Sequence, residues 1–414
     1  MKHFVRNKDI VIIGLQPWYT DIGSNCKSIA LEFAKTNRVL YINIPLNRNV
    51  IRTEKSIPEI RRHLAVIQGE KDPLEQVSPS LWNYYPKRIH ESINWIPHSH
   101  FFSIFNHLNN KRFSRDIKDA CQRLGFENYI LFNDNDIFRG HWLKSILKPS
   151  LYVYYCRDFL TSSGYFKKHG KTEEPLHIAT ADLALTNSTQ ILQYLQKFND
   201  NSHYVGQGCD LELFDANVRH NCPKELENIK GPIIGYVGNL TTRRLDISIL
   251  LNIASQRPEW NFVLVGPEDE VFQNSELHHF KNVIFTGKKE IALLPEYMQA
   301  FDVCINPQLI NQLTIGNYPL KIDEYLAMGK PIVATNTLAM EMFNKYCYLA
   351  INQKDYLNLI EKALQENSIN LQKERIVFAN EHSWKNSVRL IFNYIENTLL
   401  SKASNTRNLQ QSAG

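Results

Sequence analysis

Residues 319–336 constrain the fold most, because helix, turn and strand signals follow one another there without a gap. Pro319 suits the first turn of a helix, where its missing N–H costs no hydrogen bond. Gly329 offers a left-handed C-terminal cap, and Pro331 prevents the helix from continuing. The apolar run 332–334 indicates a short buried strand. The stretch therefore predicts a short helix, a tight turn and a strand.

Another strand is predicted at residues 301–307, so the order is strand, long loop, helix, strand. That order is typical of a parallel α/β unit, whose ligands bind beyond the carboxyl ends of the strands and against helix N-termini. Lys321 and Glu324 share the polar face of the first helical turn. Lys321 could meet a diphosphate there, and Glu324 could accept hydrogen bonds from a ribose. The alternative is a solvated ion pair of the kind common on helix surfaces.

This stretch resembles the C-terminal signature of GT-B glycosyltransferases, close to glycosyltransferase family 4 and related bacterial polysaccharide-assembly enzymes. Their typical run is Pro-x-Lys-x-x-Glu-Tyr-x-Ala-x-Gly-Lys-Pro-Val-Val, which residues 319–333 match at nearly every fixed place. The resemblance implies that Glu324 holds the ribose of a nucleotide. The family 4 motif has a further glutamate eight residues upstream, where this chain has Gly316. No contact made by that glutamate is therefore implied here.

Length and composition indicate a two-domain globular protein. A chain of 414 residues, 43% apolar and 21% charged, exceeds one ordinary domain. It has no apolar run long enough for a transmembrane helix, and its N-terminus goes into a strand without a signal-peptide core. The seven cysteines are scattered and form no CxxC pair. Reduced thiols in the cytoplasm are therefore expected, rather than disulfides or a zinc site.

The net charge of +5 is unevenly placed. Residues 1–215 carry 27 Lys and Arg against 22 Asp and Glu, whereas the remainder carries 20 of each. This excess could mark contact with the anionic inner face of a membrane or with an anionic lipid-linked acceptor, and ordinary solubility is the alternative. No basic motif is interleaved with aromatic residues, so nucleic acid is not an expected partner. Residues 46–125 contain basic clusters and aromatic residues. These residues could contact an acceptor, contact a membrane, or simply pack in the domain, and the sequence leaves the three roles open.

The N-terminal half opens with a strand at 10–14, a helix at 28–35 and a strand at 38–43. This βαβ pattern lacks GxGxxG, which disfavours a nicotinamide dehydrogenase. The loop with Gly23 and Ser24 opens the helix and could face a phosphate or a sugar. The GT-B resemblance implies that such a loop approaches the donor phosphates from the opposite domain.

Asp134 and Asp136 follow a strand predicted at 129–132 and form a DxD pattern. In GT-A glycosyltransferases this pattern holds a divalent metal on the diphosphate. Two carboxylates in an Asn-rich segment can equally shape a turn. A GT-A fold would leave the unit at 319–336 unexplained.

Asp158 stands at the carboxyl end of a strand predicted at 151–158. A carboxylate in that place lies where open sheets put their chemistry, and it could take the proton of an acceptor hydroxyl. The GT-B resemblance agrees, because an aspartate in this region acts as the base in the inverting xanthan-assembly type. The alternative is a cap for the segment 159–162.

The second domain begins with a strand that ends at Gly238 and Asn239. Arg243 and Arg244 come next, before a helix, and a glycine turn with basic residues at a helix start is a plausible diphosphate cradle. The resemblance supports this, because a Gly-x-Leu followed by Arg or Lys makes that contact in the family. It also implies a donor-site position for Lys288, in a segment whose turn lies behind the nucleotide base.

The predicted fold class is α/β, with two Rossmann-like domains facing across a cleft (GT-B). The predicted parts are an acceptor-binding domain at 1–215, a linker at 216–231, a nucleotide-sugar-binding domain at 232–385, a helix returning to the N-terminal domain at 386–400, and a disordered tail at 401–414.

The predicted function is transfer of a sugar, of hexosyl type, from a nucleotide-diphosphate sugar to a saccharide or lipid-linked acceptor in bacterial surface polysaccharide assembly. No cofactor or metal is expected, because basic side chains and helix N-termini can stabilise the leaving diphosphate. A nucleotide-sugar epimerase of the same fold would need no acceptor. A non-catalytic nucleotide-sugar-binding subunit would tolerate the loss of Asp158. A GT-A transferase would depend on a metal and on Asp134 and Asp136.

Overall fold

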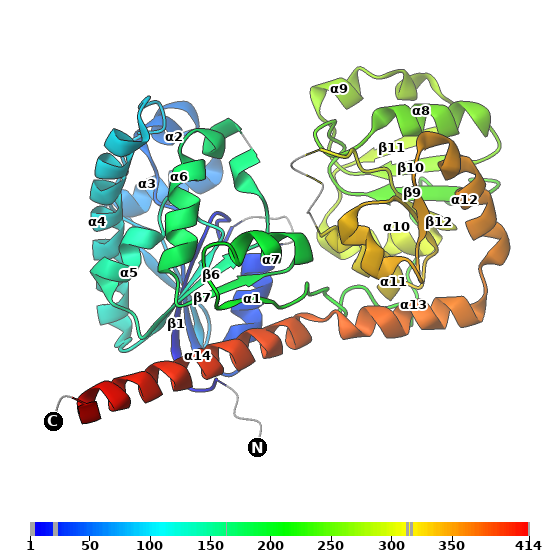
Figure 1. Cartoon of the computed structure of the whole chain (residues 1–414). Helices are drawn as coiled ribbons and strands as arrows, with labels where there is room; N and C mark the ends of the chain where they lie inside the picture. The colour runs from blue at the N-terminus through cyan, green and yellow to red at the C-terminus, as the bar shows by residue number, and fades with distance from the viewer. Residues whose placement is uncertain (1–4, 20–23, 163, 312–313, 315–317, 413–414) are drawn as a thin grey trace. The chain divides into compact units, whose positions relative to one another are not determined.

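The computed structural model describes residues 5–19, 24–162, 164–311, 314 and 318–412. The chain divides into two compact units, which are described separately. The first contains Met1–Gly206 and Ser387–Gly414, and the second contains Gln207–Asn386 (Figure 1). Among the described residues, no helix is long and apolar enough to cross a membrane.

The described part of the first unit holds an eight-stranded sheet in the order β3-β4-β2-β1-β5-β6-β7-β8. All neighbours are parallel except β3 and β4. The strands are β1 (Asp9–Gly14), β2 (Arg38–Ile42), β3 (Leu74–Ser78), β4 (Leu81–Tyr84), β5 (Ile130–Asp134), β6 (Leu151–Cys156), β7 (Leu183–Thr186) and β8 (Ser202–Tyr204). Strands β1, β5, β6 and β7 are almost wholly buried, as expected for a parallel sheet covered on both faces.

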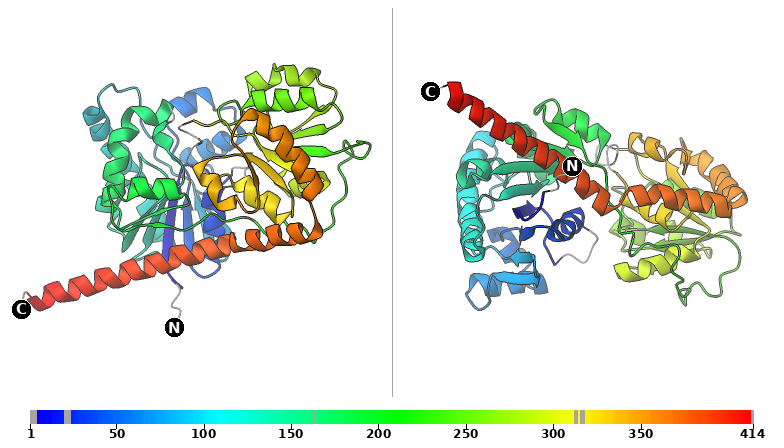
Figure 2. Two further views of the ribbon diagram at one scale, coloured as in Figure 1. Left: turned by 45° about the vertical axis from the view of Figure 1, so that its right-hand side comes forward. Right: turned by 90° about the horizontal axis from the view of Figure 1, so that it is seen from below.

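Helices cover both faces of this sheet (Figures 1 and 2). They are α1 (Asn25–Ala34), α2 (Arg48–Thr53), α3 (Pro58–Ile67), α4 (Ser99–Leu124), α5 (His141–Leu147), α6 (Gly164–Thr180), α7 (Thr189–Leu195) and the part of α14 (Trp384–Ser412) that lies in this unit. Helices α4, α5 and α6 share a core with one set of alternating strand residues, among them Val11 and Leu131. On the other face, Phe33 of α1 contacts Phe132 of β5 and stacks on Phe392 of α14.

The described part of the second unit holds a six-stranded, all-parallel sheet in the order β11-β10-β9-β12-β13-β14. The elements are β9 (Ile233–Val237), β10 (Asn261–Val265), β11 (Val283–Gly287), β12 (Val303–Asn306), β13 (Ile332–Thr335), β14 (Tyr348–Ala350), α8 (Ile247–Gln256), α9 (Glu270–Gln273), α10 (Leu294–Ala300), α11 (Leu320–Ala327), α12 (Gln353–Glu366) and α13 (Ile369–Glu381). Helices α10 and α11 pack with one core cluster, and α8 and α12 pack with the other. Each unit thus has a Rossmann-like architecture, in which a sheet lies between two layers of helices.

Helix α11 has the ends that its sequence predicts. Pro319 occupies the N-cap, and Gly329 follows the helix in the left-handed region at φ +70°. The N–H of Lys330 bonds the carbonyl of Tyr325, which closes the helix with a Schellman turn. Tyr325 is fully buried beneath the helix. The helix is therefore fixed by local signals and by one large buried side chain.

Two predicted boundaries differ from the structure. The first unit ends at Gly206 rather than at 215, because Phe214 and Leu226 pack in a core cluster of the second unit. Part of the predicted linker is thereby attached to the second unit. The tail from 401 is helical to Ser412, so the disordered tail was a wrong prediction for those residues. The segment is polar, but it contains no proline or glycine before the last residue and many good helix formers. The C-terminal helix from Ser387 onward belongs to the first unit, where Phe392 stacks on Phe33.

Candidate functional site

The second unit opens at the carboxyl ends of β9 and β12. The chain runs from β9 outward through β10 and β11 and then returns to β12 on the other side of β9. Strands β9 and β12 pair only near their starts, at Val303–Ile234 and Cys304–Gly235. The N–H of Val237 instead donates to the hydroxyl of Tyr325 in α11, at 2.8 Å. This is the topological switch point, the place where open α/β sheets bind ligands.

Two glycines shape the rim of this switch point. Gly238 after β9 has φ +140°, and Gly266 after β10 has φ +148°. A Cβ on Gly266 would lie 2.0 Å from the carbonyl oxygen of Gly238, so the two turns approach each other backbone to backbone. Side chains are thus excluded from this rim by sterics, and main-chain groups line it.

Lys321 reaches from α11 to the turn at Gly238. A Cβ on Gly238 would lie only 2.7 Å from the Lys321 Nζ. The same ammonium donates to the hydroxyl of Tyr236 and lies 3.8 Å from the centre of its ring. The structure therefore brings together two predicted donor-site residues, from β9 and α11, that are far apart in the sequence.

Burial sets the charge state of Lys321 and Glu324, both half-buried on α11. Burial lowers the pKa of Lys321 to about 7, with Glu324 opposing this shift and Arg244 adding to it. Burial raises the pKa of Glu324 to about 7, against the attraction of Lys321. This is not the solvated surface pair of the alternative interpretation. The amine is poised to gain a proton if an anion arrives beside it.

The other predicted donor residues are more exposed. Asn239 is exposed, and its carbonyl accepts a hydrogen bond from the Tyr236 hydroxyl. Arg243 and Arg244 are exposed in the turn before α8, and Arg244 is close enough to Lys321 to affect its pKa. For Arg243, backbone contacts with Thr241 and Asn311 fix its place in the turn. Lys288 is exposed directly after β11.

A buried polar cluster supports the first turn of α11. Asp323, between Lys321 and Glu324, is fully buried. Its carboxylate accepts from the Tyr318 hydroxyl at 2.6 Å and contacts Nδ1 of His382 at 2.8 Å. Burial raises the pKa of Asp323, and His382 opposes that shift. The cluster fixes the turn that carries both predicted ligand residues.

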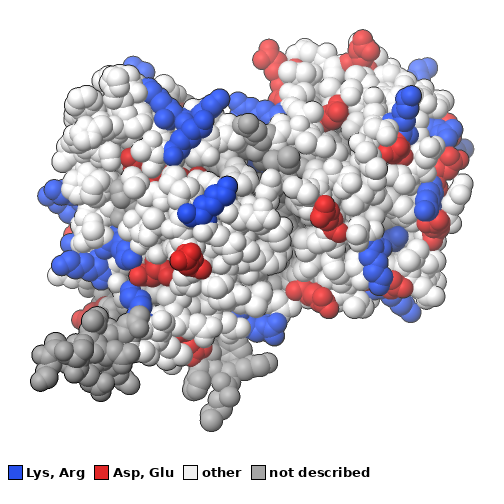
Figure 3. Space-filling view, in the orientation of Figure 1, with Lys and Arg blue, Asp and Glu red and all other residues white. Residues whose placement is uncertain are grey.

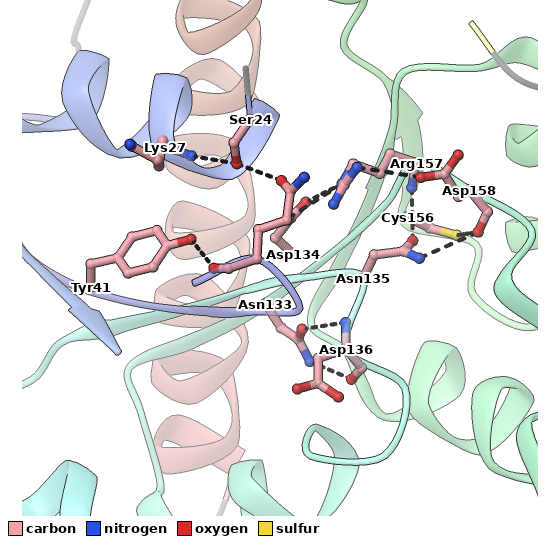
Figure 4. A network of polar contacts seen from close by, with 11 residues as sticks. Ser24, Lys27, Tyr41, Asn133, Asp134, Asn135, Asp136, Cys156, Arg157 and Asp158 are labelled. Carbon is pink, nitrogen blue, oxygen red and sulfur yellow. Dashed lines mark hydrogen bonds and ion pairs between the residues drawn. The ribbon is translucent and has the colours of Figure 1, made fainter. Parts of the chain in front are cut away.

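The first unit has its own polar network at the ends of β5 and β6, beside its switch point between β1 and β5. Figure 4 shows Asp134, Arg157 and Asp158 pointing toward one another. The Arg157 Nε lies 3.0 Å from Asp134 Oδ1, and its Nη1 lies 3.3 Å from Asp158 Oδ2. Asp134 is fully buried, whereas the Asp158 side chain is 18% exposed. Asp158 is thus the carboxylate of this network that faces solvent.

The remaining predicted residues of the first unit have structural contacts. Ser24 is the N-cap of α1, where it accepts from the Lys27 N–H and donates to Gln16. Gly23 lies outside the described residues. Asp136 is buried and pairs with Arg139. Each carboxylate of the DxD pattern is therefore held by an arginine.

Sequence reasoning missed three residues of these sites: Tyr236, Arg157 and Asp323. Tyr236 stands two residues before Gly238, and Arg157 directly precedes Asp158. Their positions next to predicted residues were the available signal. Their roles depend on contacts between elements, such as the register that sets Asp134 of β5 opposite Tyr155 of β6.

The chain is similar to known glycosyltransferases in sequence and in fold. Residues 231–366 match the family described as Glycosyl transferases group 1. TuaH of Bacillus subtilis, whose name assigns it a glycosyltransferase role in teichuronic acid biosynthesis, is 29% identical over 274 residues, 61% of this chain and 68% of TuaH.

Solved structures show the same fold. Sucrose-phosphate synthase of Thermosynechococcus elongatus has a TM-score of 0.63 at 16% identity, covering 98% of this chain and 100% of that chain. Alr3699/HepE of Anabaena, solved in complex with UDP, has a TM-score of 0.63 at 13% identity, covering 94% and 100%. The GT-A alternative is wrong for this chain, because both sheets match GT-B relatives. Residues 231–366 thus match a glycosyl transferase family, and the described chain has the fold of GT-B glycosyltransferase structures.

Proposed function

We propose that the protein transfers a hexosyl group from a nucleoside-diphosphate sugar to a saccharide or lipid-linked acceptor during assembly of a bacterial surface polysaccharide. The name of TuaH supports the polysaccharide, and the UDP bound to HepE supports a nucleotide donor. We also propose that the reaction takes place at the inner face of the cytoplasmic membrane, where the protein contacts anionic lipid.

The observation that carries the proposal is the position of Lys321. Its ammonium lies at the Gly238 turn, at the switch point of the second unit and beside the N-terminal turn of α11. A diphosphate at this point would neutralise Lys321 and meet main-chain groups of the glycine rim. Glu324, one helical turn along the same face, would accept hydrogen bonds from ribose hydroxyls.

The chemistry needs an acid–base group and stabilisation of the leaving group. We assign the base to Asp158, whose carboxylate takes the proton of the acceptor hydroxyl as the new C1–O bond forms. The bond from C1 to the donor phosphate oxygen breaks, and its electron pair leaves with the nucleoside diphosphate. Lys321, Arg244 and the N-terminus of α11 stabilise that charge, so the proposed mechanism needs no metal ion.

A thermal-shift panel of UDP-, GDP-, ADP- and CMP-sugars, each with EDTA or with Mg²⁺, tests the donor. A ligand that binds the folded state raises the melting temperature by mass action. We expect one nucleotide class to raise it in EDTA, and transfer of label from that sugar to a membrane extract. Asp158→Asn should keep the shift and lose about 10²- to 10⁴-fold in transfer rate. A shift from no nucleotide, or one that requires the metal, contradicts the proposal.

A further inference from the structure

Helix α4 presents large apolar side chains to solvent. Its outward face carries Phe101, Ile104, Phe105 and Leu108, which are 55%, 49%, 47% and 48% exposed. We call these four residues the α4 apolar face. They stand at i, i+3, i+4 and i+7, so they form one stripe along the N-terminal half of the helix. The opposite side of α4 packs on the sheet through Phe113 and Ile117.

The stripe has an apolar neighbour in the segment before α4. Trp95 is 75% exposed, the most exposed aromatic side chain among the described residues. Its carbonyl accepts from the Lys168 ammonium at 2.8 Å, and the Asn94 side chain bonds the carbonyl of Tyr165, itself 57% exposed. These contacts place the N-terminal end of α6 beside the start of α4, and Figures 1 and 2 show α4 on the outer side of its unit.

This region is positively charged. Residues 92–115 and 159–172 contain six Lys and Arg and no Asp or Glu: Lys111, Arg112, Arg115, Lys167, Lys168 and Lys171. All six except Arg112 are exposed. Glu91, just before the first segment, is paired with both Arg48 and Arg112. In Figure 3, blue side chains gather over the upper part of this unit, where α6 begins.

We infer that the α4 apolar face and Trp95 dock on an anionic phospholipid bilayer, with the lysines of α4 and α6 against the lipid headgroups. The choice of a bilayer rests on the proposed function, which places a lipid-linked acceptor there. Exposed Trp, Phe and Leu next to clustered Lys are the composition of interfacial membrane contacts. A second protein would need carboxylates to match these cations, and its binding is an outcome of the test.

Sedimentation of the full-length protein with phosphatidylcholine vesicles, with or without phosphatidylglycerol, tests the inference. We expect binding to the vesicles with phosphatidylglycerol that weakens as salt is added. Phe105→Ser should weaken it about tenfold, since one Phe side chain leaves the interface. Lys167→Ala and Lys171→Ala should each weaken it about fivefold at low salt. Lys168 is left in place, because it also holds the Trp95 segment.

Two matched variants on the second unit serve as controls. Val377→Ser removes an exposed apolar side chain, and Lys281→Ala removes an exposed cation, and neither should change vesicle binding. Equal loss in Val377→Ser and Phe105→Ser, or no binding by the wild type, overturns the inference. So does a wild-type dimer that Phe105→Ser makes monomeric.

Donor binding separates this inference from the proposed function. Phe105→Ser should keep the thermal shift given by the nucleotide sugar while losing vesicle binding. If the wild type binds vesicles but no nucleotide sugar, the proposed function is contradicted and membrane docking through the α4 apolar face is still supported. If the wild type binds a nucleotide sugar but no vesicles, only the inference of membrane docking is overturned.

Discussion

At the residue scale, Lys321 is held where its own charge is disfavoured. Burial lowers the pKa of Lys321 to about 7, and the amine is beside Tyr236 and the turn at Gly238. A buried amine that exists only to stabilise the fold would have a close carboxylate partner. Among the described residues, no ion pair joins Lys321 to Glu324. This observation supports the proposal that Lys321 receives an incoming anion.

This gives a prediction about pH. The protonated amine pairs with the diphosphate of a nucleotide sugar, whose charge is fixed near neutrality. Above the pKa of about 7 the free protein must take up a proton to bind, so affinity should fall by up to about tenfold per pH unit. Calorimetric titrations across this range measure the slope. Lys321→Arg should flatten it, because guanidinium stays charged. An equal slope in both proteins would refute this account.

Gly238 gives a second prediction at this scale. In Gly238→Ala, the new Cβ would lie 2.7 Å from the Lys321 Nζ at φ +140°. The ammonium must move, so we expect affinity for the nucleotide sugar to fall at least about tenfold, along with a strain cost of about 1–3 kcal/mol. Gly69→Ala is the control, with φ +82° and open space around its Cβ. Gly69→Ala should lower the melting temperature through backbone strain but leave the affinity for the nucleotide sugar unchanged. If Gly69→Ala lost as much affinity as Gly238→Ala, the steric explanation would be contradicted.

At the element scale, α11 depends on the cluster beneath it. Asp323→Ala leaves the Tyr318 hydroxyl and the His382 ring without their buried acceptor, so it should cost about 2–4 kcal/mol in urea unfolding. Asp323→Asn keeps an oxygen acceptor and should cost clearly less. If the two variants lose the same free energy of unfolding, the cluster does not act through these hydrogen bonds.

The sequence predicted α11 well because its signals are local: a proline, an apolar face and a capping glycine. It did not predict α4, whose pattern is misleading. Asn106, Asn109 and Asn110 are buried on this helix, whereas Phe101 and Phe105 are exposed. A 3.6-residue apolar period then points to the wrong side of the helix. An inverted pattern of this kind is itself a sign of function outside the core.

The candidate site was predictable in part. Lys321, Glu324 and Gly238 were assigned from motifs, and the structure places the first beside the last. The pairing of Arg157 with Asp134 was not predictable, since it depends on how β5 and β6 align. The register of strands and the packing of helices are set by the whole sheet rather than by any one stretch.

At the scale of the whole molecule, the chain consists of two units with separate cores. We expect two transitions in scanning calorimetry, with a nucleotide sugar raising only that of the second unit. Phe392→Ala removes the ring that stacks on Phe33 at 4.9 Å, so it should destabilise the first unit by about 3–5 kcal/mol. Leu400→Ala, exposed on the same helix, is the control and should change neither transition. If Phe392→Ala shifted only the transition of the second unit, the assignment of α14 to the first unit would be contradicted.

The measurement that tests the central claim most directly is a calorimetric titration of the nucleotide sugar into wild type, Lys321→Ala and Glu324→Ala. Lys362→Ala and Glu366→Ala are matched controls, since these residues form an exposed i,i+4 pair on α12 of the same unit. We expect each α11 variant to bind at least about tenfold more weakly, while the controls bind like the wild type. Unchanged affinity in both α11 variants would contradict the donor site.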